Sequence, residues 1–394
     1  MGKSIKIAAA LAGALLLAAC STMRDFDDGA TIRALNASAA ELATPKTVHF
    51  ATTRCNHRPA VETPGTPEDL FAKRCWDAAM QDRDMIRLGF GMAEDAHVYC
   101  GTASVAVAPA SAGEKAATTV ATPVSSECGE GFDALRRAVL ATPCRCAMIF
   151  VHGFNTTFAF GLKRTAQLAL DLGYEGVPIL FSFAASGRFD DYINDIEAAE
   201  LSARALHRLL AALTQDDAGR KPSIDVIAHS MGGRVVLRAI GEGEAPSLRY
   251  VVLAAPDVDP AYFLQLAAKA APHARRMTVY TAKYDVAMST SKAAHDGRAR
   301  LGEGLNASVA TNLPRTDIID ATAHATDPYA HSYFAESKLV IDDIRAAFQG
   351  KPAAERQPLV CDDTTPVVAC KIPCREGADC GPTWYARFMH WLFG

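Results

Sequence analysis

The sequence lacks three features that would each place it in a well-defined class of protein. Its 394 residues carry a formal net charge of −4, so it has no basic field of the kind that attracts nucleic acid. Beyond residues 1–20, no apolar run reaches the roughly 20 residues that a transmembrane helix needs. No internal repeat is visible, so a repeat architecture is not expected. What remains is 49% hydrophobic and 21% charged residues, a mixture that is typical of a globular body.

Residues 1–20 resemble the signal peptide of a bacterial lipoprotein. Lys3 and Lys6 form a short basic region, and the apolar run that follows at residues 7–19 is too short to cross a bilayer. The run ends in Leu-Ala-Ala-Cys, and by this resemblance Cys20 is the lipidated first residue of the mature protein. Its acyl chains would anchor the protein at the cell envelope, on the periplasmic face or at an outer membrane. A plain secretory signal that happens to contain a cysteine is the alternative.

The number of cysteines agrees with export. Eleven are present, and an even number remains when Cys20 is set aside. In an oxidising compartment we expect these to form disulfides, although the sequence does not determine their pairing. The simplest arrangement closes the C-terminal tail, residues 350–394, with two bridges among its four cysteines, Cys361, Cys370, Cys374 and Cys380.

Zinc is the alternative use of closely spaced cysteines. Cys144 lies close to Cys146, and Cys370 lies close to Cys374, but no histidine stands at ligand spacing beside either pair. We therefore predict no metal site, and we assign no cysteine a catalytic role.

Short apolar runs alternate with helical patterns along the middle of the chain. The runs predict strands that are buried on both faces; they span residues 147–151, 178–183, 224–228, 249–255, 277–282 and 316–320. Residues 162–172 and 195–213 have the periodicity of helices, the second with Leu201 assigned to its apolar side. This alternation predicts an α/β fold with a mostly parallel central sheet flanked by helices. We place this domain at residues 47–349, after a tether at 21–46 and before the cysteine-rich tail at 350–394.

Ser230 stands where one of these strands ends. The strand at 224–228 ends just before it, and Gly232 opens a predicted helix just after it. Small residues around a serine at such a turn are typical of the nucleophile elbow of α/β-hydrolases, which exposes the serine hydroxyl. The usual pattern is Gly-x-Ser-x-Gly, and Ala228 replaces the first glycine by another small residue. The alternative is a serine in an ordinary strand–helix connection.

A short loop that contains Gly153 follows the strand at 147–151. A glycine directly after a strand lets the backbone turn and aim an N–H group at a ligand. In this arrangement an oxyanion hole takes one N–H group from this loop and one from the residue after the nucleophile, so the amides of Phe154 and Met231 are the candidates. We expect His152 to brace the turn. Neighbours of these amides should also line the site, namely His152, Gly153, Asn155 and His229.

The acid of a triad follows a later strand in this fold, and three aspartates compete for that role. Asp285 lies just beyond the strand at 277–282, which is the usual source of the acid, and is therefore preferred. Asp257 and Asp259 follow the earlier strand at 249–255 and are the alternative, with Asp257 also expected to line the site. The carboxylate would hold the imidazole in the correct tautomer and stabilise the imidazolium.

The base comes last in the chain order of this fold. His331 follows the strand at 316–320 and precedes a helical pattern, which favours it. His324 is the close competitor, and His295 is too near Asp285 in the sequence to be preferred. The order serine, acid, histidine together with its place before a helical pattern therefore favours His331, and His324 stays open as the alternative.

Several segments between residues 47 and 347 resemble the signatures of an uncharacterised bacterial esterase/lipase-like family of the α/β-hydrolase superfamily. The resemblance implies the hydrolase fold and a triad of Ser230, Asp285 and His331, but it implies no substrate. The cysteine-rich tail lies outside it. The segments are Phe50-Ala51-Thr52-Thr53-Arg54, Phe150-Val151-His152-Gly153-Phe154-Asn155, Ala228-His229-Ser230-Met231-Gly232, Ala255-Pro256-Asp257-Val258-Asp259, Tyr284-Asp285-Val286-Ala287, Arg300-Leu301-Gly302 and His331-Ser332-Tyr333.

The residues and the resemblance together predict a serine hydrolase of carboxylic esters at the cell envelope. It would work through an acyl-enzyme without a cofactor, on a small-molecule or lipid ester, and no nucleic acid partner is expected. Two alternatives remain, a non-catalytic scaffolding or binding lipoprotein that keeps the fold, and an acyltransferase with the same triad. The sequence specifies neither the acyl chain length of the substrate nor the oligomeric state.

The chain closes with an aromatic and basic stretch, residues 384–393. We expect this stretch to dock on the body of the protein, and contact with a membrane surface is the alternative.

Overall fold

The computed structural model describes residues 32–56, 90–109, 118–129, 132–185, 192–216, 219, 221–241, 246–304, 313, 315–362, 369–374 and 380–393. The predicted signal peptide and the predicted lipidation site, Cys20, lie outside these residues. Among the helices of the described chain, none is both long and apolar enough to cross a membrane.

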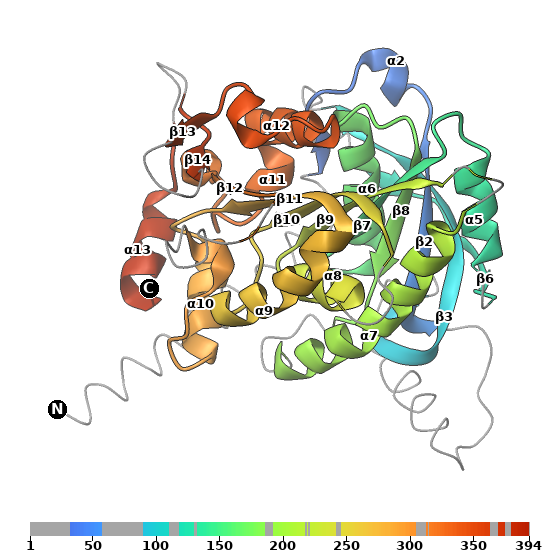
Figure 1. Ribbon diagram of the computed structural model, residues 1–394, viewed down its shortest axis with the longest axis horizontal. Coiled ribbons are helices and arrows are strands. Elements are labelled where there is room, and N and C mark those ends of the chain that lie inside the picture. Colours follow the sequence, from blue (N-terminus) through green and yellow to red (C-terminus); the bar gives the residue numbers. More distant parts are fainter. Residues whose placement is uncertain are drawn as a thin grey trace, which may run out of the picture.

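A twelve-stranded mixed sheet forms the centre of the molecule (Figure 1). Its strands follow one another in the order β13-β14-β12-β11-β10-β9-β7-β8-β2-β3-β5, and β6 also pairs with β3. The strands are β2 (Lys46–Asn56), β3 (Phe90–Ala106), β5 (Thr119–Val120), β6 (Val124–Glu127), β7 (Cys146–Val151), β8 (Val177–Ser182), β9 (Ser223–His229), β10 (Leu248–Ala254), β11 (Ala274–Thr281), β12 (Thr316–Asp320), β13 (Val360–Asp362) and β14 (Ala369–Lys371).

The sheet is mostly parallel, as the sequence predicts. Every neighbouring pair from β2 and β8 through to β12 and β14 is parallel. The outer strands β3, β5, β6 and β13 pair antiparallel with their neighbours. The central strands are continuous apolar runs because both of their faces are covered. In β7, Met148 and Phe150 point into one hydrophobic core, and Ala147, Ile149 and Val151 point into the other.

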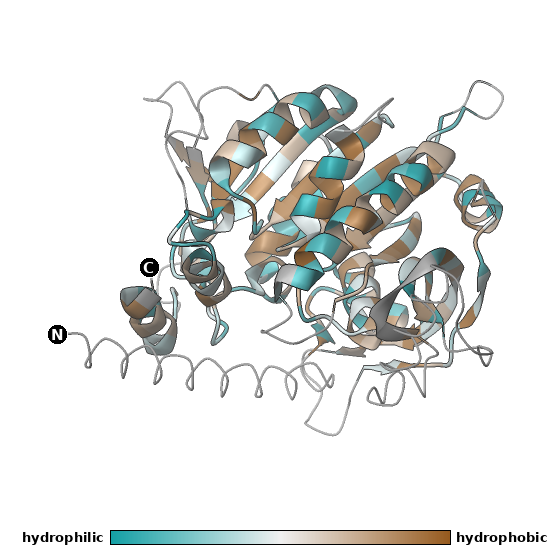
Figure 2. Ribbon diagram, turned by 90° about the horizontal axis from the view of Figure 1, so that it is seen from below, coloured by the Kyte–Doolittle hydropathy of each residue, from teal (hydrophilic) through white to brown (hydrophobic). Residues whose placement is uncertain are grey.

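Helices cover both faces of the sheet (Figure 1). One layer contains α6 (Phe158–Asp171), α11 (Tyr333–Glu336) and α12 (Lys338–Phe348), and the other contains α5 (Asp133–Leu140), α7 (Tyr192–Leu213), α8 (Gly232–Gly241) and α9 (Pro260–Ala270). Figure 2 shows hydrophilic and hydrophobic residues alternating around the helices of the second layer. This is expected for helices that bury one side and expose the other.

The predicted elements are present, with bounds that differ by a few residues, and β12 spans the predicted residues 316–320. One side-chain placement is wrong. Leu201 on α7 is 55% exposed and does not belong to the apolar side of the helix. It shares the solvent-facing side of α7 with Arg204 and Arg208, which are also exposed.

The segment predicted as a tether, residues 21–46, is described from residue 32 onward, and there it is packed against the body. Ile32 is buried, and β1 (Arg33–Ala34) pairs with β4 (Ala108–Pro109). The short helix α2 (Ala39–Leu42) follows. Any free tether therefore ends before Ile32.

The C-terminal tail extends the central sheet. Its strand β14 pairs with β12, and β13 pairs with β14. The tail contains two disulfides of its own, as expected, which join Cys361 to Cys370 and Cys374 to Cys380. The last helix, α13 (Trp384–Phe393), lies at the end of the sheet in Figure 1 and packs against α10 (Val286–Ala294).

Other cysteines outside the tail are also paired. Cys100 is bonded to Cys128, and the closely spaced Cys144 and Cys146 form a disulfide with each other. Cys55 is disulfide-bonded as well. The zinc alternative for the pair at 144 and 146 is therefore not what the structure contains.

Candidate active site

Ser230 occupies a sharp turn between β9 and α8. Its backbone has a φ of 52°, in the left-handed region that residues other than glycine seldom adopt. Its N–H group donates to the carbonyl oxygen of Ala254 at 2.9 Å, which ties the turn to β10. Only glycine fits at position 232, because an added Cβ would lie 2.4 Å from the carbonyl oxygen of His152.

The loop after β7 approaches this turn closely. A Cβ on Gly153 would lie 2.9 Å from the Cβ of Ser230, so only glycine lets the loop pass at this distance. The next N–H group, that of Phe154, donates no hydrogen bond to a described residue, and the same holds for the N–H group of Met231. Two unpaired N–H groups flanking Ser230 are the arrangement that an oxyanion hole requires.

Asp285 and His331 are brought together from different strands. Asp285 follows β11 and caps α10 by accepting the N–H group of Met288 at 3.0 Å on its Oδ1. Its Oδ2 accepts the Nδ1–H group of His331 at 2.7 Å. Burial is the largest single effect and would lower the pKa of His331, but the Asp285 carboxylate, its hydrogen bond and the nearby carboxylates of Asp327 and Asp257 together raise the pKa above its usual value.

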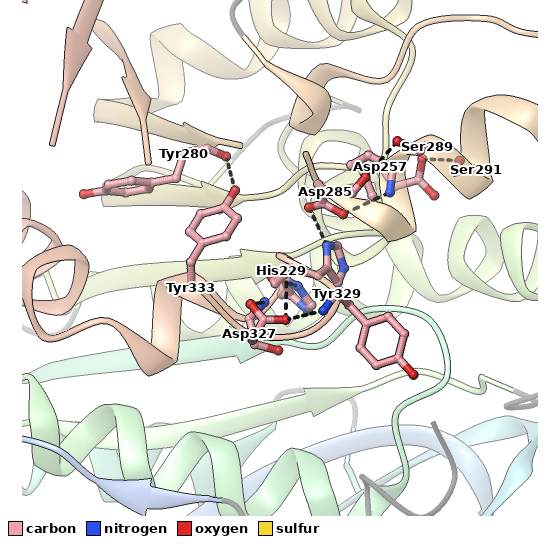
Figure 3. A network of polar contacts seen from close by, with 12 residues as sticks. His229, Asp257, Tyr280, Asp285, Ser289, Ser291, Asp327, Tyr329 and Tyr333 are labelled. Atoms are coloured by element: carbon pink, nitrogen blue, oxygen red, sulfur yellow. Dashed lines mark hydrogen bonds and ion pairs between the residues drawn. The ribbon is translucent and has the colours of Figure 1, made fainter. Parts of the chain in front are cut away.

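The loop that carries His331 is organised by Asp327. Its carboxylate accepts three backbone N–H groups, from Tyr329 at 3.1 Å, His331 at 3.2 Å and Ser332 at 3.1 Å. Figure 3 shows Asp327 and Asp285 with their bonds to this loop. The hydroxyl of Tyr333 donates to the carbonyl oxygen of Tyr280 on β11 at 3.1 Å and fixes the far side of the loop. The loop is therefore held on both sides of His331, which fixes where the imidazole lies.

The competing histidines lie elsewhere. His324 donates through Nε2 to the carbonyl oxygen of Pro373 in the tail at 3.2 Å, and it does not line the cavity described below. His295 caps the C-terminal end of α10 and donates through Nδ1 to the carbonyl oxygen of Ser291 at 2.8 Å.

The competing aspartates also have other partners. Asp259 caps α9 through hydrogen bonds from the N–H groups of Ala261 and Tyr262. Asp257 is buried against Arg300, whose Nε donates to its Oδ1 at 2.6 Å. Burial alone would raise the pKa of Asp257, but Arg300 and the hydrogen bonds around the carboxylate lower it. Asp285 is the aspartate that the structure places against His331.

His152 is a buried brace. Its Nδ1–H group donates to the carbonyl oxygen of Gly153 at 2.7 Å, and its ring stacks on Phe183. Burial, together with the positive charge of Arg54, lowers the pKa of His152 to about 3, so the ring is neutral. Arg54 donates through Nη2 to the Nε2 atom of His152 at 3.2 Å and to the carbonyl oxygen of Thr156 at 2.6 Å. Arg54 therefore holds both ends of the loop that presents the Phe154 amide.

His229 packs between two rings beside Ser230. Its ring lies 4.4 Å from that of His331 and stacks on Phe334 at 4.6 Å, measured between ring centroids. Its Nε2–H group donates to the carbonyl oxygen of His331 at 3.3 Å. Burial, the neighbouring imidazole of His331 and the guanidinium of Arg164 keep the pKa of His229 well below its usual value. This neutral ring supports the backbone of the loop at 331.

A cavity of about 530 Å³ connects these groups. Ser230 and His331 both line it, and no hydrogen bond joins their side chains. Of the other expected lining residues, His152, Asn155, His229 and Asp257 face the cavity, and Gly153 lies against Ser230. Much of the wall is apolar, formed by Phe150, Phe154, Phe160, Val286, Met288, Phe334 and Met389.

Four residues shape the site without having a role that the sequence predicts. Arg54 and Arg300 lie within segments that resemble the family signatures, and that was the only signal for them. Asp327 stands four residues before His331, where an aspartate side chain commonly caps a turn. Met389 reaches the cavity from α13, and no local pattern marks it.

No group of three or more potential metal ligands is found among the described residues.

Comparisons with known proteins address the family of the chain. A family model described as an alpha/beta hydrolase of unknown function (DUF900) matches residues 133–347. Among solved structures, an esterase of Pyrococcus furiosus is similar with 10% sequence identity and a TM-score of 0.32, over 81% of this chain and 95% of that chain. This likeness is too distant to carry an argument about activity, and no curated protein matches. Because the family model covers more than half of the 394 residues, the chain belongs to this family of α/β-hydrolases.

Proposed function

We propose that this hydrolase cleaves carboxylic esters with Ser230 as nucleophile, His331 as general base and Asp285 as the acid that orients His331. The Oγ atom of Ser230 attacks the ester carbonyl carbon while the Nε2 atom of His331 takes the hydroxyl proton. The carboxylate of Asp285 stabilises the imidazolium that forms. The N–H groups of Phe154 and Met231 bind the oxyanion, and each such donor is worth about 3 to 4 kcal/mol of transition-state stabilisation.

The second half of the reaction releases the acyl group. His331 gives its proton to the departing alcohol as the ester C–O bond breaks, which leaves the acyl group on Ser230. A water molecule then attacks the acyl carbon and passes a proton to His331. That proton returns to the Oγ atom of Ser230 as the carboxylic acid leaves. The scheme needs no cofactor.

One observation carries the proposal. His331, hydrogen-bonded to the buried Asp285, lies on the wall of the same cavity as Ser230, whose own backbone is held in a left-handed turn. A buried aspartate that accepts Nδ1–H leaves the Nε2 atom of His331 as the base. A serine in an ordinary strand–helix connection has no need of such a pair beside it.

The cavity wall favours an ester with an apolar acyl or alcohol part. Aromatic and aliphatic side chains, among them Phe154, Phe160 and Met389, dominate the wall. Apolar groups of a substrate gain free energy in proportion to the area that leaves water. We expect hydrolysis to become faster as an acyl chain lengthens enough to fill the cavity.

We further propose that the protein is held at the cell envelope through lipidated Cys20. The support is the lipoprotein-like sequence of residues 1–20 and the disulfides, which persist in oxidising compartments. Metabolic labelling with a fatty acid should mark the wild-type chain and not Cys20→Ser. A labelled Cys20→Ser chain would contradict this assignment.

A fluorophosphonate probe tests the catalytic proposal directly. We expect it to label the wild-type protein and to leave Ser230→Ala unlabelled. Ser223→Ala is the matched control, because Ser223 begins the same strand β9 at its opposite end and should label normally. A folded wild-type protein that takes no label would support a non-catalytic scaffold instead.

Product analysis defines the reaction once labelling succeeds. A panel of esters of increasing acyl chain length, run on the wild type and Ser230→Ala together, should show activity only in the wild type. Adding competing alcohols or amines distinguishes hydrolysis from acyl transfer. Formation of the free acid in their presence supports a hydrolase, and preferential formation of new esters or amides would identify an acyltransferase.

A further inference from the structure

The last helix, α13, is apolar on nearly all of its sides. Four of the seven exposed large apolar side chains of the described chain lie on it, namely Trp384, Phe388, Trp391 and Leu392. Trp384 and Trp391 are each 78% exposed. Residues spaced by three, four and seven positions share one face of a helix, so these side chains form one continuous strip. A helix that is apolar all around is normally covered on every side.

The inner side of α13 forms part of the candidate active site. Ala386 and Met389 are buried, and Met389 lines the cavity that contains Ser230. The helix packs against α10, which begins directly after Asp285. The ring of Tyr385 also meets that of Tyr329, a cavity residue on the loop of His331, at 6.2 Å between centroids. Whatever covers the outer strip of α13 is therefore placed beside the cavity.

Two cations share the ring of Tyr284, which packs against His390 of α13. The Nζ atom of Lys283 lies 5.5 Å from the ring centre of Tyr284, and the guanidinium carbon of Arg387 lies 5.8 Å from it. Both side chains are exposed. Neither pairs with a carboxylate in the part of the chain that the structure describes. Cations without a carboxylate partner, one of them on the same helix as the exposed tryptophans, match a surface of anionic lipid headgroups over an apolar interior.

We propose that α13 seats the protein on a lipid bilayer, so that the cavity lined by Met389 meets the membrane surface and the substrate is an ester of a membrane lipid. This inference rests on the proposed function. With 10 residues, α13 is about 15 Å long and lies along the surface, because the hydrocarbon core is about 30 Å thick. Tryptophan side chains are enriched at the interface between the lipid headgroups and the hydrocarbon core.

The length of chain before the body favours a bilayer over a protein partner. Ile32 is the first described residue and is buried, so Cys20 lies only 12 residues before a fixed point of the fold. Twelve residues span at most about 40 Å when fully extended. An anchor at Cys20 would thus keep the body within reach of the membrane at all times. No protein partner needs to be recruited to cover the strip.

Tryptophan fluorescence tests the seating of α13 on the full lipidated chain. The sequence contains three tryptophans, and Trp76→Phe leaves only Trp384 and Trp391 to report. The probe is a vesicle of phosphatidylethanolamine and phosphatidylglycerol with brominated acyl chains, which quench tryptophans at the acyl boundary. We expect strong quenching of this protein.

The matched control moves the reporter to another exposed apolar position. Leu201 lies on α7, which is separated from α13 by α8, α9 and α10 in Figure 1. In a chain with Trp76→Phe, Trp384→Phe, Trp391→Phe and Leu201→Trp, we expect quenching to be severalfold weaker. Equal quenching at both positions, or unquenched tryptophans on α13 of the anchored chain, would overturn the proposal. The second result would favour a protein as the partner of this face.

An activity measurement separates this inference from the proposed function. Trp384→Ser with Trp391→Ser should slow hydrolysis of an ester embedded in vesicles on the order of tenfold, because two large apolar contacts with lipid are lost. Hydrolysis of a water-soluble short-chain ester should be unchanged, and Leu201→Ser should affect neither substrate. Equal hydrolysis of the embedded ester by the variant and the wild type would contradict the inference. A wild type that cleaves no ester would contradict the proposed function, and the quenching result would still stand by itself.

Discussion

The Nδ1–H group of His331 donates to the Oδ2 atom of Asp285 at 2.7 Å, although 46 positions separate the two residues in the chain. Asp285 is fully buried at the start of α10, whereas His331 sits on a loop after β12. The bond orients the imidazole within the cavity that Ser230 also lines. Its electrostatic consequence is a measurable pH dependence.

Activity should rise with pH through a midpoint above the usual histidine pKa of 6.5. Burial opposes the charged form of His331, but the Asp285 carboxylate, its hydrogen bond and the charges of Asp327 and Asp257 together outweigh burial and raise the pKa. The protonated imidazole has no free lone pair to act as a base, so activity is lost below this pKa and gained above it. The measurement is kcat/KM for a soluble ester as a function of pH. A flat profile would exclude His331 as the base.

Asp285→Asn should lower kcat by about 10³- to 10⁴-fold, because the amide no longer selects the tautomer with Nδ1–H and no longer stabilises the imidazolium. The pKa of His331 should fall because the negative charge of Asp285, which raises it, is lost. Any residual activity should therefore rise with pH through a lower midpoint than in the wild type. Steady-state kinetics across pH measure both effects. An unchanged kcat would show that Asp285 is not the acid.

Asp327→Ala should lower kcat by about 10- to 100-fold with little change in KM. The carboxylate accepts three N–H groups of the loop, and without it the His331 ring is no longer held in position. Asp327→Asn is the informative comparison. It keeps one acceptor oxygen and should restore part of kcat, but it removes the charge that also raises the pKa of His331. If Asn and Ala variants have equal kcat, loop order is not what Asp327 supplies.

Arg54→Lys should reduce kcat by roughly tenfold, because one ammonium cannot replace the guanidinium that contacts Ser182, His152 and Thr156 together. The loop that presents the Phe154 amide then loses its support. Fluorophosphonate labelling should persist but proceed more slowly. Normal labelling and kcat in a variant of reduced thermal stability would show that Arg54 serves the fold alone.

Arg300→Ala should destabilise the protein by about 3 to 5 kcal/mol, because it leaves the buried carboxylate of Asp257 without its cation. Urea denaturation measures the loss in the free energy of unfolding. The matched control is Asp257→Asn combined with Arg300→Met, which removes both charges. We expect the double variant to be more stable than Arg300→Ala. A single variant as stable as the wild type would mean that the ion pair contributes nothing.

The fold was accessible from the sequence because parallel strands buried on both faces are continuous apolar runs. That rule predicts β7 through β12, helical periodicity predicts α6 and α7, and the small residues around Ser230 predict the turn before α8. Such local patterns fail where a residue's surroundings depend on how elements pack. Leu201 satisfies a helical period and yet faces water, because α7 turns that side away from the sheet.

The sequence by itself determined the α/β architecture. It also limited the polar groups of the site to a few candidates on loops after particular strands. Both features depend on local patterns of apolar, small and turn-forming residues. Tertiary structure alone shows which of these candidates lie against one another. His324 and His331 follow the same strand, but only packing turns the first toward Pro373 and the second toward Asp285. The same holds for Arg54 behind the loop at 153 and for Met389 in the cavity wall. Such contacts join segments far apart in the chain, and no neighbouring residue encodes them.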